Sequence, residues 1–136
     1  MYKEITVKEA LELDNALLVD VRSEGEYGEA TIPGSVNVPL LSDEERSAVG
    51  TTYRVEGPDA ARRLGLHLVS HKLPGKLEVV DKLAGGKKLA VFCWRGGQRS
   101  QFMASFLDTM GYNVYRVIGG YKAYRRLVKD YLERVE

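Results

Sequence analysis

Short apolar runs alternate along the chain with segments whose apolar residues recur at helical spacing. The runs are typical of buried strands and occupy residues 17–21, 36–38, 89–93 and 113–118. The other segments predict helices that begin at Ser23 and Ser100 and cover residues 42–49, 57–72, 76–84 and 121–134. Gly50 and Gly111 are expected to close helices, and Pro74 with Gly75 to break the chain. This alternation predicts an α/β fold with a central parallel sheet flanked by helices on both faces.

The composition is that of one globular domain, which we assign to residues 1–136. Hydrophobic residues make up 44% of the chain and charged residues 29%. The chain contains no apolar run near the ~18 residues of a membrane-spanning helix, and its first residues lack the apolar core of a secretory signal. We therefore expect a cytoplasmic protein with no membrane partner. The net charge of +1 neither demands nor excludes a nucleic-acid partner.

The chain has one cysteine, Cys93, which excludes an intrachain disulfide and a cysteine-rich zinc site. His67 and His71 lie four residues apart on a predicted helix, a spacing that can bind a metal ion. Because no third ligand lies near them in sequence, we expect both histidines to be solvated. The sequence predicts no metal and no cofactor.

Cys93 ends the most apolar run, and a polar loop and then a helix follow it. Gly96 and Gly97 allow the loop amides to turn toward a common centre, and the helix N-terminus adds oriented N–H groups. Arg95 and Arg99 add full positive charges. Such surroundings favour a thiolate, so the pattern predicts a nucleophilic Cys93 in an anion cradle. The cradle is assigned to Trp94, Arg95, Gly96, Gly97, Gln98, Arg99 and Ser100.

Several further residues have two interpretations each. Asp20 and Arg22 lie on the same side of a strand end, where they form a buried ion pair or support the cysteine loop from a neighbouring strand. Trp94 either covers the loop or stacks on a base or on an allylic chain. A basic cluster near the C-terminus is either a solvated helix face or a set of phosphate contacts, and it comprises Lys122, Arg125, Arg126 and Lys129.

Three motifs together resemble the rhodanese family. Residues 18–22 with Glu26 and Tyr27, and then residues 32–39 (IPGSVNVP), resemble the N-terminal signature of these domains. Residues 117–123 (VIGGYKA) resemble their closing motif, so the resemblance covers about residues 3 to 132. It implies that Cys93 carries a persulfide and that thiosulfate is a possible donor. Thr31 stands where many of these domains have histidine.

The cysteine loop is one residue longer than is common in rhodaneses. Its C-x5-R-S spacing also fits cysteine-dependent phosphatases, so phosphatase chemistry stays open. A phosphatase needs a general acid to protonate the leaving group. Asp20 and Asp43 are the residues to test for that role. Two more functions stay open at this point, namely a stand-alone thiosulfate sulfurtransferase and a non-catalytic docking module for tRNA or a partner subunit.

Residues 43–69 refine the resemblance because most rhodanese domains lack their motifs. With residues 93–100 and 119–123, they resemble the N-terminal rhodanese domain of tRNA 2-selenouridine synthases. That family exchanges sulfur for selenium at the wobble 2-thiouridine of tRNA. The resemblance implies a Cys93 persulfide or perselenide, selenophosphate as donor and tRNA as partner. The family also has a P-loop domain, whose motif is absent from this sequence. The chain is therefore expected to be either one part of a split enzyme, with a separate P-loop chain as its partner, or a truncated piece of a longer protein.

Overall fold

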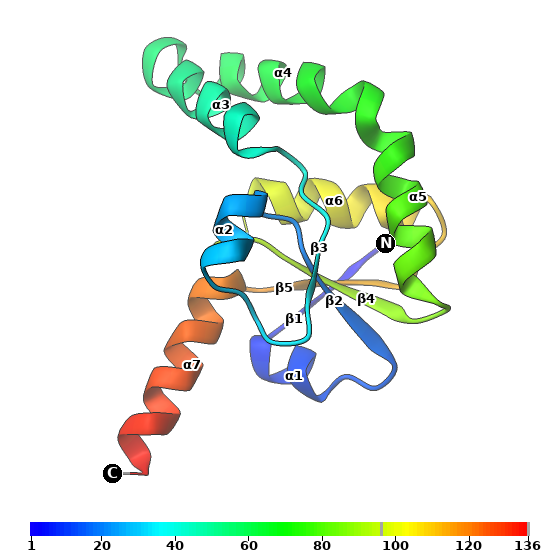
Figure 1. Ribbon diagram of the computed structural model, residues 1–136, viewed down its shortest axis with the longest axis vertical. Coiled ribbons are helices and arrows are strands. Elements are labelled where there is room, and N and C mark those ends of the chain that lie inside the picture. Colours follow the sequence, from blue (N-terminus) through cyan, green and yellow to red (C-terminus); the bar gives the residue numbers. More distant parts are fainter. Residues whose placement is uncertain (96, 136) are drawn as a thin grey trace.

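The computed structural model describes residues 1–95 and 97–135, and within them five strands form one sheet in the order β1-β5-β4-β2-β3 (Figure 1). Each neighbouring pair is parallel, as strands joined by helical crossovers must be. The expected α/β fold with a parallel sheet is confirmed. The strands are β1 (Lys3–Ile5), β2 (Ala16–Asp20), β3 (Val36–Asn37), β4 (Lys88–Phe92) and β5 (Val114–Val117).

Helices cover both faces of the sheet, as the sequence predicts (Figure 1). They are α1 (Val7–Glu12), α2 (Glu24–Glu29), α3 (Asp43–Glu56), α4 (Pro58–Val69), α5 (Leu73–Ala84), α6 (Gln98–Thr109) and α7 (Gly120–Arg134). The 3-10 turn η1 (Ser70–Lys72) joins α4 to α5. Helices α1 and α7 lie on one face, and α5 and α6 lie on the other. None of the helices in the described part of the chain is both long and apolar enough to cross a membrane.

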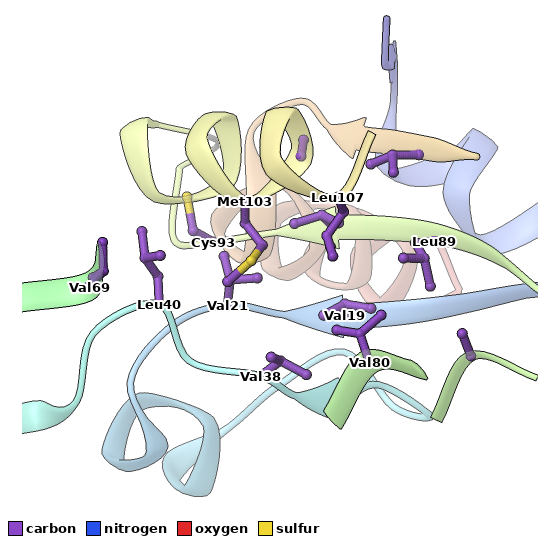
Figure 2. Packing of buried hydrophobic residues seen from close by; sticks show 14 of the residues in the cluster. Val19, Val21, Val38, Leu40, Val69, Val80, Leu89, Cys93, Met103 and Leu107 are labelled. Carbon is purple, nitrogen blue, oxygen red and sulfur yellow. The ribbon is translucent and has the colours of Figure 1, made fainter. Parts of the chain in front are cut away.

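Strand β4 is central, and its side chains alternate between two cores. Leu89 and Val91 pack against α5 and α6, whereas Ala90 and Phe92 pack against α1 and α7. A strand that is buried on both faces has a continuous apolar sequence, which is why the sequence locates it so clearly. Cys93 continues the alternation and points into the core below α6, as Figure 2 shows.

Two of the predicted helix boundaries are wrong. The helix that starts after Ser42 continues through Gly50 to Glu56, where Gly57 ends it with a φ of 99°. A glycine inside a helix costs only about 1 kcal/mol relative to alanine, and the packing of α3 against α4 offsets that cost. Pro74 does not break a helix, because it lies in the first turn of α5, where a backbone N–H has no partner to lose.

Candidate active site

Cys93 stands at the carboxyl end of β4, directly before the loop that leads into α6. The residue is only 2% exposed, and its Sγ donates a hydrogen bond of 3.2 Å to Oγ of Ser100 in the first turn of α6. The Ser100 hydroxyl donates in turn to the carbonyl of Gly97 at 3.1 Å. A hydroxyl has one proton and two lone pairs, so Ser100 can accept from a thiol and can rotate to donate to a thiolate.

The first turn of α7 holds the start of the cysteine loop in place. The backbone N–H of Tyr121 donates to the Cys93 carbonyl at 2.8 Å, and that of Lys122 donates to the Trp94 carbonyl at 2.9 Å. The first N–H groups of a helix have no partner within the helix, so these bonds satisfy groups that would otherwise need water. Gly119, with a φ of 77°, allows the chain to turn from β5 into this position.

The predicted cradle residues take different positions. Ser100 is buried, Trp94 and Arg99 are half-buried, and Arg95, Gly97 and Gln98 are exposed. Gly96 lies outside the described residues. Of the two predicted arginines, Arg99 lines a hollow of about 320 Å³ beside the loop, and Arg95 does not line it. The hollow is lined by Arg22, Glu26, Glu29, Arg46, Trp94 and Arg99.

Glu26 of α2 is a central residue of this hollow, and the sequence does not single it out as a site residue. Its carboxylate accepts a hydrogen bond of 2.6 Å from Arg99 Nη1, and Nε of Arg46 lies 3.4 Å away. The backbone N–H and the hydroxyl of Ser23 donate to the same carboxylate. Burial on its own would raise the pKa of Glu26, but the hydrogen bond and charge of Arg99, with the bonds from Ser23, hold it below its ordinary value.

Asp20 and Arg22 form a buried ion pair at the end of β2. The Nη2 atom of Arg22 lies 2.7 Å from the Asp20 carboxylate, and the Arg22 and Asp20 side chains are 3% and 0% exposed. The hydroxyl of Thr31 also donates to Asp20, at 2.8 Å. The Arg22 guanidinium lies 4.5 Å from the centre of the Tyr121 ring, so the pair is joined to the first turn of α7 and through it to the cysteine loop.

The remaining candidates lie at the surface. His67 and His71 are both exposed, in α4 and η1. In residues 1–95 and 97–135, no group of three or more His, Cys, Asp and Glu side chains has an arrangement that could hold a metal ion. The predicted basic cluster lies on α7, where Arg125, Arg126 and Lys129 are exposed and Lys122 lies in the first turn.

The comparison with known proteins gives consistent matches. The model of the rhodanese-like domain matches residues 5–127. The chain is 36% identical to the tRNA 2-selenouridine synthase of Nitrosomonas europaea, over 92% of this chain and 33% of that protein. It is 41% identical to the tRNA 2-selenouridine synthase of Bordetella bronchiseptica, over 92% of this chain and 35% of that protein. The chain thus spans about a third of the length of these relatives.

A solved structure matches closely over nearly its whole length. It is the N-terminal domain of a putative ATP/GTP binding protein from Clostridium difficile 630. The match has a TM-score of 0.87 and 40% sequence identity, and it covers 93% of this chain and 98% of that one. A rhodanese-related protein from Thermoplasma volcanium, at 21% identity and a TM-score of 0.56 over 92% of each chain, has the same fold.

Proposed function

The chain belongs to the rhodanese-like domain family, and we propose that it transfers sulfur or selenium through Cys93 in the conversion of tRNA 2-thiouridine to 2-selenouridine. The observation that carries the chemistry is the position of Cys93 between the end of β4 and the start of α6, with Sγ bonded to Ser100. The identity of 36% and 41% to two named tRNA 2-selenouridine synthases supports the substrate.

With thiosulfate as the sulfur donor, the Cys93 thiolate attacks the outer sulfur and forms a new S–S bond. The S–S bond of thiosulfate breaks, and sulfite leaves with the electron pair, so the step needs no oxidant. The product is a Cys93 persulfide, whose negative charge the loop amides and the Ser100 hydroxyl stabilise. A selenium donor with the same bond type, selenosulfate, would load Cys93 as the perselenide by the same step. The thiolate attacks selenium, the Se–S bond breaks, and sulfite leaves with the electron pair.

The residues around Cys93 have proposed roles in this step. Arg99, which lines the hollow, attracts the anionic donor, and exposed Arg95 adds a second positive charge at the loop. Trp94, Gly97 and Gln98 supply loop and helix N-terminal amides, and Gly96 is assigned with them from the sequence. The Asp20–Arg22 pair supports the loop through Tyr121.

Phosphatase chemistry has less support than sulfur transfer, because its two candidate acids already bind other groups. Asp20 accepts hydrogen bonds from Arg22 and from Thr31. Asp43, at the start of α3, accepts from the backbone N–H of Gly25. Sulfur transfer from thiosulfate releases sulfite without a general acid, so it does not require Asp20 or Asp43 to donate a proton.

The test is the intact mass of the full chain after incubation with thiosulfate and, separately, with selenosulfate. We expect a gain of one sulfur or one selenium atom that is absent from Cys93→Ala. The Cys93→Ala variant should keep its circular dichroism spectrum, since alanine fits the space of a small buried side chain. No adduct from either donor, together with turnover of a phosphate ester that depends on Cys93, would overturn the proposal.

A further inference from the structure

A groove runs along α7 and begins at the cysteine loop. Its volume is about 650 Å³. Trp94, the residue that follows Cys93, lines both this groove and the hollow that contains Arg99. Figure 1 shows α7 extending away from the sheet toward the C-terminus. We call this surface the α7 groove. Its lining includes Trp94 and Leu132, the cations Lys122, Arg125, Arg126 and Lys129, and the two carboxylates Asp130 and Glu133.

Positive charge is concentrated on α7. The helix has five basic and two acidic side chains, a net charge of +3, so the rest of the chain carries −2 of the total of +1. Lys122, Arg125 and Lys129 are spaced three and four residues apart and therefore share one helix face. No described carboxylate forms a salt bridge with them, in contrast to Arg22 and Arg99 of the hollow, which are both ion-paired. The cations of the α7 groove are thus free to bind an anionic partner.

Trp94 presents an aromatic surface at the start of this basic face. Its ring packs on Tyr121, with ring centres 5.8 Å apart, and the residue is still partly exposed. The Arg125 guanidinium lies 5.8 Å from the centre of the Trp94 ring, so charge and aromatic surface are adjacent. The bond from Lys122 N–H to the Trp94 carbonyl fixes the backbone of Trp94. A flat aromatic side chain beside a row of cations is the arrangement that binds single-stranded nucleic acid.

We propose that the α7 groove binds single-stranded RNA, with a base stacked on Trp94 and phosphates bound by Lys122, Arg125 and Lys129. This inference rests on the proposed function, because it names the surface that would hold the RNA substrate beside Cys93. Bases that protein side chains can reach lie in single-stranded loops, and stacking on aromatic rings is their common mode of binding. A base on Trp94 would stack on the residue that follows Cys93 in the chain, on the α7 face of the sheet.

The test uses Trp94 itself as the probe, since it is the only tryptophan in the chain. The full chain is titrated with a short oligouridylate while tryptophan fluorescence and oligonucleotide anisotropy are followed. We expect quenching on binding, because the stacked base contacts the indole. The double variant R125Q/K129Q should bind about tenfold more weakly, and its affinity should depend less on salt, by about one unit in the log–log slope.

The matched control is K82Q/K87Q, which removes two exposed lysines outside the α7 groove. It should bind RNA as the wild type does. Equal weakening by both double variants, or binding that leaves Trp94 fluorescence unchanged, would overturn the inference. So would binding to phosphatidylglycerol vesicles without binding to the oligouridylate. Sulfur loading of the wild-type chain is measured separately by mass, so a failure of RNA binding and a failure of Cys93 chemistry are distinguished.

Discussion

Arg99 donates a hydrogen bond of 2.6 Å to the carboxylate of Glu26, although 73 residues separate the two in sequence. Glu26 belongs to α2, whereas Arg99 belongs to the first turn of α6, directly after the cysteine loop. Arg46 of α3 lies 3.4 Å from the same carboxylate. One carboxylate therefore joins the cysteine loop to α2 and to α3. An anionic donor that enters the hollow must compete with Glu26 for Arg99.

The Glu26→Gln variant should bind an anionic donor more tightly. The substitution removes a negative charge and releases Arg99 from its ion pair with residue 26. For a partly exposed pair, this changes the free energy of donor binding by about 1 kcal/mol, which is roughly fivefold in affinity. The thiosulfate concentration that gives half-maximal loading of Cys93, followed by intact mass, should fall by that factor. Glu29→Gln is the control, because Glu29 lines the same hollow and no described cation forms a salt bridge with it. Weaker loading in Glu26→Gln would mean that Glu26 positions Arg99 for the donor.

The stability that Glu26 contributes should disappear at low pH. Its pKa in the folded chain lies below the ordinary 4.5, so the ionised carboxylate stabilises the fold above that pH, and the contribution is lost as pH falls through the folded-state pKa. The free energy of unfolding in urea should therefore be higher for the wild type than for Glu26→Gln at about pH 7, and the difference should shrink as the pH falls below 4.5 and through the folded-state pKa. A difference that grows on acidification would contradict this assignment.

The Ser100→Ala variant should slow the loading of Cys93. Alanine removes the hydroxyl that contacts Sγ, and a thiolate or persulfide then loses one hydrogen-bond donor. We expect a loading rate about tenfold lower and a loss of about 1 kcal/mol in the free energy of unfolding, because the Gly97 carbonyl also loses a donor. Ser105→Ala, at an exposed position of the same helix, should leave both quantities unchanged. Unaltered loading in Ser100→Ala would remove Ser100 from the mechanism.

The sequence predicts best where a local pattern determines the structure. The continuous apolar run at residues 89–93 identifies the central strand because burial on both faces demands it. Ser23 and Ser42 identify helix starts because each side chain caps its own helix. The order of strand, Cys93, loop and helix likewise places the cysteine at the carboxyl end of the central strand. These inferences use residues that are close in sequence.

The features that the sequence does not reveal depend on contacts between distant residues or on very short elements. Strand β1 has three residues, too few for an alternating pattern, and it forms only by pairing with β5. Helix α1 has six residues and is also absent from the predicted elements, although Thr6 and Glu9 form a capping box that could have revealed it. Glu26 and Arg46 enter the hollow because α2 and α3 fold beside the cysteine loop, and no local spacing indicates that contact.

The Gly119→Ala variant tests whether the turn before α7 positions the cysteine loop. Its φ is 77°, which side chains rarely adopt, and a Cβ built there would lie 2.7 Å from Cβ of Ala123. Gly119→Ala must therefore shift the first turn of α7, whose N–H groups at Tyr121 and Lys122 bind the carbonyls of Cys93 and Trp94. We expect a loss of about 1–3 kcal/mol in the free energy of unfolding and slower loading of Cys93.

The matched control is Gly65→Ala, in the middle of α4. Apart from its chain neighbours and the backbone of α4 itself, no atom lies within 4 Å of the added Cβ, and the helical backbone suits alanine. This variant should therefore gain about 0.5–1 kcal/mol in the free energy of unfolding and load normally. Urea unfolding and intact mass measure the two quantities on the same samples. If Gly119→Ala loses stability but loads Cys93 at the wild-type rate, the bonds from α7 support the fold without positioning the thiol. Slower loading without denaturant, where the variant is fully folded, would instead show that α7 positions the loop for transfer.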